Sequence, residues 1–324
     1  MHNLDQYRNE FIHYLDKEVQ VKEPHNLYAP ISYILGLGGK RIRPVMTLMA
    51  ADIFGGDYRQ ALDAALAIEV FHNFSLVHDD IMDGAPLRRG QATVHKKWDV
   101  NTGILSGDAM IISSYRFLER YNGNTFKDLV QLFGKTAIEV CEGQQFDVDF
   151  ESREDVTIRE YFKMIEYKTA VLLGAALKMG AIVAGTDKET QDLIYEYGRN
   201  LGIAFQLQDD YLDAFGDPET FGKQVGGDII ENKKTFLYLK ARELASPQQL
   251  QDLDHLFSIS PKDPTDKINS VKNIFLESGV SEHAQKEIKG FTQMAFKKLT
   301  NLRVSEGKRT ILRQFGEGLM MREA

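Results

Sequence analysis

The sequence lacks the features that mark secreted and membrane proteins. It contains one cysteine, Cys141, so no disulfide can form within the chain, and this fits a reducing cytoplasm. Residues 1–20 show no basic segment followed by an apolar one, so we expect no signal peptide. The most apolar window, residues 170–185, is interrupted by Lys178 and is shorter than the ~20 residues that a membrane span needs. We therefore predict a cytoplasmic protein with no transmembrane segment.

The chain also lacks the positive charge of a general nucleic-acid binder. Its formal net charge is -8 over 324 residues, whereas proteins that bind nucleic acid are usually basic. We expect no nucleic-acid partner. An acidic chain can still bind an anion through a bridging cation, so anionic substrates stay open. Hydrophobic residues make up 43%, an ordinary fraction for a globular protein of a length that can bury a sizeable core.

Strand patterns are scarce, and helical patterns fill the chain. Alternating strands flanked by hairpin turns are not evident, and several of the 8 prolines stand where helices should break. Apolar residues recur at three- and four-residue spacing over 61–83, 160–185 and 192–215. No Ser/Gly-rich linker divides the sequence. We predict one all-α domain over residues 1–324, a bundle of long helices, with short peripheral helices from about residue 246 onward.

Two clusters of aspartates stand near the ends of apolar helices. Their members are Asp79, Asp80 and Asp83 in one and Asp209, Asp210 and Asp213 in the other. Residues i and i+4 share a helix face, so the first and last aspartates of each cluster project together and repel. Neither cluster contains a basic residue. One such cluster would be as well explained by a solvated acidic helix end. Two suggest a cation clamp on a diphosphate, and a set of oxygen ligands suits Mg²⁺ or Mn²⁺ rather than zinc.

Basic residues accompany both clusters. The segment GLGGKRIRP carries Lys40, Arg41 and Arg43, which could hold phosphate or form a basic helix start at the surface. It is not a Walker A motif. Arg88 and Arg89 follow the first cluster by one loop, and metal with arginine binds a diphosphate better than either alone.

Four further basic side chains need an explanation. His72 precedes Asp79 by two helical turns on the same face, so we favour ligand contact over a core role. Lys168 lies in an apolar helix and must either snorkel or face a polar cavity. Lys223 and Lys233 follow the second cluster and supply cations near it.

Five motifs in order, within residues 35–240, resemble the motif series of the trans-isoprenyl diphosphate synthases, the polyprenyl synthetase family. They are GGKRIRP, LVHDDIMDGAPLRRG, YKTA, FQLQDDYLDAFGD and FGKQVGGD with the following KKT. The resemblance implies an all-helical bundle around a deep central cavity, usually a homodimer. It implies Mg²⁺-dependent condensation of an allylic diphosphate (dimethylallyl, geranyl or farnesyl) with isopentenyl diphosphate. The elongated product retains one diphosphate, and a second is released.

The resemblance also assigns roles to residues. Asp79 and Asp83 would hold two Mg²⁺ ions on the allylic diphosphate, and Asp209 would hold a third; Mn²⁺ could substitute. The supporting acids would be Asp80, Asp210 and Asp213. The residues expected to act on the allylic substrate are Arg88, Lys168, Thr169, Gln206, Lys223 and Lys233, with Thr169 and Gln206 lining the reacting carbons. Those expected to bind isopentenyl diphosphate are Lys40, Arg43, His72 and Arg89.

Residues before the first cluster bear on product length. The resemblance marks Ser75 and Phe74, four and five positions before Asp79, as the residues that set the depth of the channel. Helical spacing places Phe71 on the face of Asp79. An aromatic ring followed by a small residue looks most like geranylgeranyl synthases, with farnesyl enzymes close behind. We predict a C15–C20 product with C20 favoured, unless both rings are ordinary core packing.

Alternative functions remain open at this stage. A terpene cyclase or a squalene- or phytoene-type synthase is also helical and metal-dependent, but such enzymes usually alter one acidic motif and lack GGKRIRP. A longer-chain polyprenyl diphosphate synthase would share every motif. A non-enzymatic helical scaffold could carry acidic surface clusters. Because both clusters are complete, an inactive regulatory subunit is disfavoured.

Overall fold

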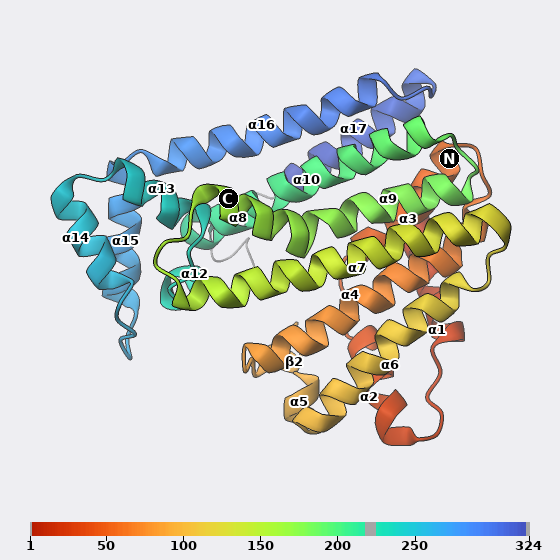
Figure 1. Cartoon of the computed structure of the whole chain (residues 1–324), viewed down its shortest axis with the longest axis horizontal. Coiled ribbons are helices and arrows are strands. Elements are labelled where there is room, and N and C mark those ends of the chain that lie inside the picture. The colour runs from red at the N-terminus through yellow and green to blue at the C-terminus, as the bar shows by residue number, and fades with distance from the viewer. Residues whose placement is uncertain (1, 218–224, 322–324) are drawn as a thin grey trace. The chain divides into compact units, whose positions relative to one another are not determined.

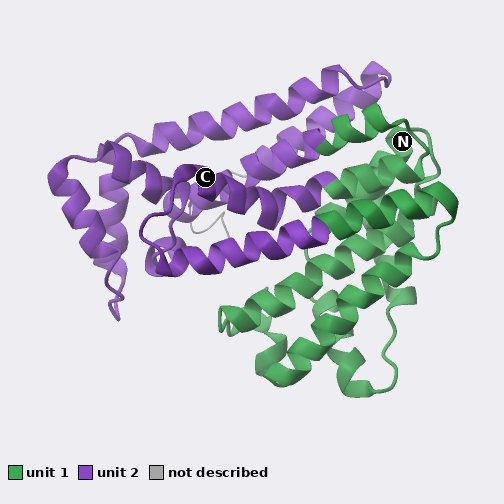
Figure 2. Ribbon diagram, viewed as in Figure 1, with its two compact units in different colours: residues 1–135, 175–195 green, residues 136–174, 196–324 purple. Residues whose placement is uncertain are grey.

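The computed structural model describes residues 2–217 and 225–321, which are helical over most of their length (Figure 1). The all-α prediction is confirmed. The chain divides into two compact units, residues 1–135 with 175–195 and residues 136–174 with 196–324 (Figure 2). The single-domain organisation stays a prediction. Among the described residues, no helix has the length and apolar character needed to cross a membrane.

Unit 1 is built around α4. Its elements are α1 (Leu4–Glu18), α2 (His25–Gly36), α3 (Ile42–Ile53), η1 (Tyr58–Ala61), α4 (Leu62–Met82), β1 (Leu87–Arg88), β2 (Gln91–Ala92), α5 (Val94–Lys97) and α6 (Val100–Leu118). Unit 1 also includes the start of α7 (Gly123–Ser152), most of α9 (Val171–Val183) and the start of α10 (Lys188–Phe215). Apolar residues surround α4 on most of its circumference, so it is buried against α3 and α6.

A Schellman motif ends α4 immediately after the first aspartate cluster. Gly84 has φ +62, its amide donates to the carbonyl of Ile81, and the amide of Ala85 donates to the carbonyl of Asp80. Glycine adopts this left-handed conformation without a steric penalty. The cluster is thereby held in the last turn of a buried helix.

The segment after α4 forms a small hairpin that the sequence did not predict. Strands β1 and β2 pair antiparallel, with Leu87 opposite Ala92 and Arg88 opposite Gln91. The two turn residues, Arg89 and Gly90, have φ of +53 and +75, as a type I′ turn requires. Two-residue strands are too short to show an alternating pattern, which is why the sequence signal was absent.

Unit 2 holds the rest of α7, α9 and α10 and the chain's C-terminal helices. The further elements are α8 (Ile158–Ile165), η2 (Glu166–Ala170), α12 (Gly227–Ile230), α13 (Phe236–Leu244), α14 (Pro247–Leu256), α15 (Thr265–Glu277), α16 (Val280–Thr300) and α17 (Glu306–Met320). Their core includes Tyr161, Leu207, Phe236 and Phe275. The expectation of short helices after residue 246 was wrong for α16, which has 21 residues and packs against α13 and α17. Its sequence reads as polar because one face is exposed.

The expected helices are confirmed at 61–83 and 192–215, where α4 and α10 lie. The expected helix at 160–185 is interrupted. A π-helical segment, η2, separates α8 from α9, and the amide of Val171 donates to the carbonyl of Glu166, five residues back. An inserted residue of this kind often marks a functional site.

Candidate active site

The first aspartate cluster stands at the unfavourable end of its helix. Asp79 and Asp80 lie in the last turn of α4, and Asp83 is its C-cap. The helix dipole places partial negative charge there, so carboxylates are disfavoured and cations are favoured. Asp83 is exposed and Asp79 is partly buried. This position is explained if a cation binds between these side chains.

Asp80 has a different environment from its neighbours. It is 1% exposed, and Arg88 of the hairpin donates to both of its carboxylate oxygens, with Nε 2.8 Å from each. A bidentate pair of this kind is among the stronger charged hydrogen bonds. The cluster sequence contains no cation, but the fold supplies one to Asp80. Arg88, expected to contact the allylic diphosphate, is thus anchored beside the cluster by Asp80.

Unit 1 also gathers the expected cations for isopentenyl diphosphate. The guanidinium of Arg89 lies against Gly39 and donates to the carbonyl of Gly38, which brings the hairpin turn to the GGK loop. Gly38 and Gly39 have φ of +79 and +115, conformations that favour glycine. Lys40 follows in the same loop and is exposed.

Arg41 does not belong to this set of ligand-facing cations. Its side chain is buried and forms an ion pair with Glu69 of α4, NH1 to Oε1 2.5 Å. Arg43 is near the same carboxylate, but its Nε is buried and has no hydrogen-bond partner in the described part of the chain. Burial, together with repulsion from Arg89, lowers the pKa of Arg43 to about 10. The surplus of positive charge around Arg43 suits an anion.

His72 lies close enough to these arginines to feel their charge, and its contact with a ligand stays a prediction. Burial and the positive charges of Arg43 and Arg89 hold its pKa well below the ordinary value, so the imidazole is neutral at neutral pH. The three residues expected to set product length lie on the same helix. Phe71 is fully buried and Phe74 nearly so, with their ring centroids 5.4 Å apart, and Ser75 donates to the carbonyl of His72.

The second cluster, in unit 2, repeats the arrangement. Asp209, Asp210 and Asp213 occupy the last two turns of α10, again at the negative end of the helix dipole. Asp210 is buried and accepts hydrogen bonds from Tyr161, at 2.6 Å, and from Gln206, at 2.8 Å. No cation is hydrogen-bonded to Asp210 among the described residues.

Asp228, at the start of α12, joins this cluster although the sequence did not single it out. Its backbone amide donates to the Asp213 carboxylate at 3.0 Å. Burial, followed by repulsion from Asp210 and Asp213, raises the pKa of Asp228; burial with repulsion from Asp209 and Asp213 also raises that of Asp210. Lys233, expected near the second site, offsets this only weakly, because its Nζ is 3.9 Å from Asp228 and 2.9 Å from Glu231.

These carboxylates fit a divalent cation. Clustered carboxylate oxygens are the kind of donor that Mg²⁺ and Ca²⁺ bind. No three acidic, histidine or cysteine side chains form a ready metal cage within residues 2–217 and 225–321. Mg²⁺ is usually held by one or two carboxylates, with phosphate and water completing its shell. A bound diphosphate would therefore be part of the site.

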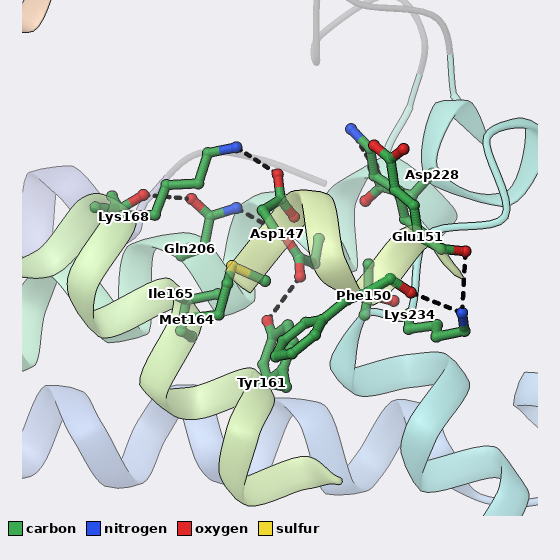
Figure 3. Close-up of a pocket in the computed structure, with 14 residues that line it drawn as sticks. Asp147, Phe150, Glu151, Tyr161, Met164, Ile165, Lys168, Gln206, Asp228 and Lys234 are labelled. Carbon is green, nitrogen blue, oxygen red and sulfur yellow. Dashed lines mark hydrogen bonds and ion pairs between the residues drawn. The ribbon is translucent and has the colours of Figure 1, made fainter. Parts of the chain in front are cut away.

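The π-helical segment η2 carries Lys168 and Thr169 into a cavity of unit 2 (Figure 3). Lys168 donates to Asp147 of α7 at 2.5 Å, and Thr169 donates to Gln206 of α10 at 3.2 Å. The cavity is also lined by Asp210. Lys168 thus faces a polar cavity, the second of the two explanations open at the sequence level.

Sequence reasoning missed several residues of this cavity, among them Asp147, Tyr161 and Asp228. All three line it, and each contacts or repels a residue that the motifs did identify. Only Asp228 had a sequence signal, since it lies within FGKQVGGD, whereas Asp147 and Tyr161 lie in none of the five motifs. Lys223, expected to contact the allylic diphosphate, lies outside the described residues.

Comparison with known proteins agrees with this chemistry. A model of the polyprenyl synthetase family matches residues 24–275. Geranylfarnesyl diphosphate synthase of Natronomonas pharaonis is 40% identical over 267 residues, which cover 77% of each chain. The crystal structure of a geranylgeranyl pyrophosphate synthase is similar over 100% of both chains, with 52% identity and a TM-score of 0.96.

A more distant structure includes ligands in its description. It is a geranylgeranyl pyrophosphate synthase from Corynebacterium glutamicum, complexed with isoprenyl diphosphate and magnesium. It is 26% identical, with a TM-score of 0.85, over 99% of this chain and 98% of its own. Motifs, helical fold and near-complete coverage agree, and we conclude that the chain belongs to the polyprenyl synthetase family, as a prenyltransferase of the short-chain type.

Proposed function

We propose that the chain condenses isopentenyl diphosphate with an allylic diphosphate in a divalent-cation-dependent reaction, and that its main product is the C20 diphosphate. The observation that carries the metal dependence is the position of both aspartate clusters at the C-terminal ends of helices, where the dipole disfavours carboxylates. The excess negative charge around Asp210, Asp213 and Asp228 supports it.

The reaction breaks the C–O bond of the allylic diphosphate heterolytically, and the electron pair leaves with the diphosphate. Bound Mg²⁺, held by Asp79, Asp83 and Asp209, would stabilise the charge that develops on this leaving group. Lys168 would donate to the same diphosphate, and its pairing with Asp147 orients the ammonium. Arg88, anchored on Asp80, would do so from the first cluster.

The allylic cation is then attacked by the double bond of isopentenyl diphosphate, which forms the new C–C bond, and a proton is lost. Arg43, Arg89 and Lys40 would hold the isopentenyl diphosphate, and neutral His72 can donate a hydrogen bond to it without adding charge. Thr169 and Gln206 would line the reacting carbons. The departing diphosphate would accept this proton, since the side chains assigned to the site are cationic, metal-binding or unsuited to take a proton.

A C20 product is favoured by the aromatic pair before the first cluster and by the similarity to a geranylgeranyl pyrophosphate synthase. The similarity to a geranylfarnesyl synthase makes a product one C5 unit longer the second candidate. We also infer a homodimer, from the family resemblance.

Mass analysis of the reaction products tests this function. Incubation with Mg²⁺, isopentenyl diphosphate and each allylic primer should give diphosphates longer than the primer by whole C5 units. A terpene cyclase would instead consume the allylic diphosphate alone and release a hydrocarbon. A scaffold protein would leave all substrates unchanged.

A further inference from the structure

The backbone of η2 is approached very closely by one glycine from each of two neighbouring helices. A Cβ on Gly143 of α7 would lie 2.7 Å from the Cα of Lys168 and 2.7 Å from the carbonyl carbon of Tyr167. A Cβ on Gly202 of α10 would lie 2.6 Å from the Cα of Ala170. Carbon atoms normally meet at ~3.5–4.0 Å, so neither position has room for a side chain.

Each glycine stands one helical turn before a polar side chain that contacts η2. Gly143 precedes Asp147 by four residues on α7, so both share the helix face that meets Lys168. Gly202 precedes Gln206 by four residues on α10, and Gln206 accepts the hydroxyl of Thr169. The four-residue spacing between a glycine and a polar side chain therefore occurs on both α7 and α10. The two polar side chains contact the adjacent residues Lys168 and Thr169.

At each glycine the backbone of its helix touches the backbone of η2. This contact determines the distance between η2 and the next turn of that helix, which carries the polar side chain. The pairs Lys168–Asp147 and Thr169–Gln206 are at hydrogen-bond distance because α7 and α10 approach this closely. A methyl group at either glycine would push its helix away by about 1 Å to restore ordinary contact. That displacement is enough to lengthen the corresponding hydrogen bond beyond useful range.

We propose that Gly143 and Gly202 are positioning residues of the prenyl transfer. Because neither has a side chain, α7 and α10 can pack directly against the backbone of η2, and this close packing holds Lys168 and Thr169 in place. The inference rests on the proposed function, in which those two side chains act on the allylic substrate. Neither glycine touches substrate; each acts through the side chain that it positions.

Gly143→Ala and Gly202→Ala test this against a matched control, Gly180→Ala. Gly180 is also a buried helical glycine, and its added Cβ would overlap the backbone carbonyl oxygen of Thr47 and lie 2.9 Å from the Cβ of Ala50, but it lies in unit 1 and not beside η2. Thermal melting measures the cost to stability, and steady-state kinetics below the melting point measure kcat per folded molecule. All three variants should melt earlier than the wild type.

Gly143→Ala and Gly202→Ala should each lower kcat roughly 100-fold, as expected for a misplacement of about 1 Å. The KM for isopentenyl diphosphate should change little. Gly180→Ala should keep kcat within about threefold of wild type, since the folded fraction retains the site. In a Lys168→Ala background, Gly143→Ala should cost far less activity than in the wild type, because the two act through the same group.

Equal kcat values in Gly143→Ala, Gly202→Ala and Gly180→Ala would overturn the inference. So would failure of both η2 variants to fold under conditions in which Gly180→Ala folds, because the glycines would then be purely structural. An inactive wild-type enzyme would contradict the proposed function itself, whereas an active wild type with unaffected variants contradicts only the role of the glycines.

Discussion

At the scale of single residues, several carboxylates of the candidate site sit where the local fold disfavours their negative charge. Asp79 and Asp209 lie at C-terminal helix ends, and Asp228 is pushed toward its protonated form by its acidic neighbours. A protein keeps such an arrangement only if something else compensates the charge. In the proposed function, divalent cations and the cationic side chains around a diphosphate would supply that compensation.

Asp79→Ala should lower kcat by at least the ~100–1000-fold that accompanies loss of one transition-state stabiliser. The reason is that Asp79 is expected to hold metal on the leaving diphosphate. Steady-state kinetics at saturating Mg²⁺ check this. Asp252→Ala is the control, since Asp252 is an exposed aspartate of α14 that accepts a hydrogen bond from Gln248. Near-normal turnover in Asp79→Ala would show that this carboxylate holds no essential metal.

The pKa of Asp228 predicts how stability depends on pH without metal. Its pKa is raised in the folded state, so between the ordinary value near 3.9 and the raised value the folded chain binds more protons than the unfolded chain. The free energy of unfolding of chelator-treated protein should therefore fall as pH rises through this window. Urea melts at several pH values measure it. The decrease of the free energy of unfolding with pH should become less steep in Asp228→Asn and stay unchanged in Asp252→Asn. An equally steep decrease in Asp228→Asn would show that Asp228 is not the group responsible.

The residue scale also shows where sequence reasoning stops. The paired spacing of Asp79 with Asp83 and of Asp209 with Asp213 is visible in the sequence, because i and i+4 positions share a helix face. The family resemblance assigned Arg43 and not Arg41 to substrate, but only the fold shows that Arg41 forms a buried ion pair with Glu69. Asp147 was missed because its partner Lys168 is distant in sequence and lies on another helix.

At the scale of elements, short irregular pieces position the chemistry more than the long helices do. The hairpin β1–β2 carries Arg88 to Asp80 and Arg89 to the GGK loop, and the π segment η2 directs Lys168 and Thr169 to two different helices. Helical periodicity predicts α4 and α10 well. It cannot predict a two-residue strand or one inserted helical residue, because neither changes the pattern over a window long enough to detect.

The loop and hairpin predict a kinetic difference between two neighbouring arginines. Arg43→Ala should raise the KM for isopentenyl diphosphate more than the KM for the allylic primer, because Arg43 lies among the cations assigned to that substrate. Arg89→Ala should also raise the KM for isopentenyl diphosphate more than the KM for the allylic primer. Arg41→Ala should instead lower the free energy of unfolding by ~3–5 kcal/mol, the usual cost of breaking a buried ion pair, with little change in the ratio of the two KM values. Equal effects of Arg43→Ala on both substrates would refute the assignment.

The aromatic residues of α4 predict a change in product length. Phe74 retains 9% exposure, whereas Phe71 is fully buried and packs edge-on against Phe133 of α7, with centroids 5.3 Å apart. Phe74→Ala should yield longer products by removing a ring that blocks the growing chain. Phe71→Ala should chiefly destabilise, by ~3–5 kcal/mol. Chromatography with mass detection and thermal melts separate the two effects; an unaltered product distribution in both variants would mean that these rings are core packing only.

At the scale of the whole molecule, the family and its reaction class were accessible from the sequence, because five motifs in fixed order constrain most of the chain. The family match over residues 24–275 and the similarity to a geranylgeranyl pyrophosphate synthase agree with them. The proposed product length rests instead on the packing of a few side chains such as Phe74, which a motif reports only indirectly. The number of metal ions and the homodimer also stay predictions.

The most direct test of the account is the mass of the product formed with and without metal. Enzyme freed of metal by a chelator is incubated with isopentenyl diphosphate and farnesyl diphosphate, and half of the sample receives excess Mg²⁺. We expect geranylgeranyl diphosphate to accumulate only in the sample with Mg²⁺. Two results would contradict the claim that the two aspartate clusters support a metal-dependent prenyl transfer. One is full turnover in the chelator-treated sample without Mg²⁺, and the other is the absence of an elongated diphosphate from both samples.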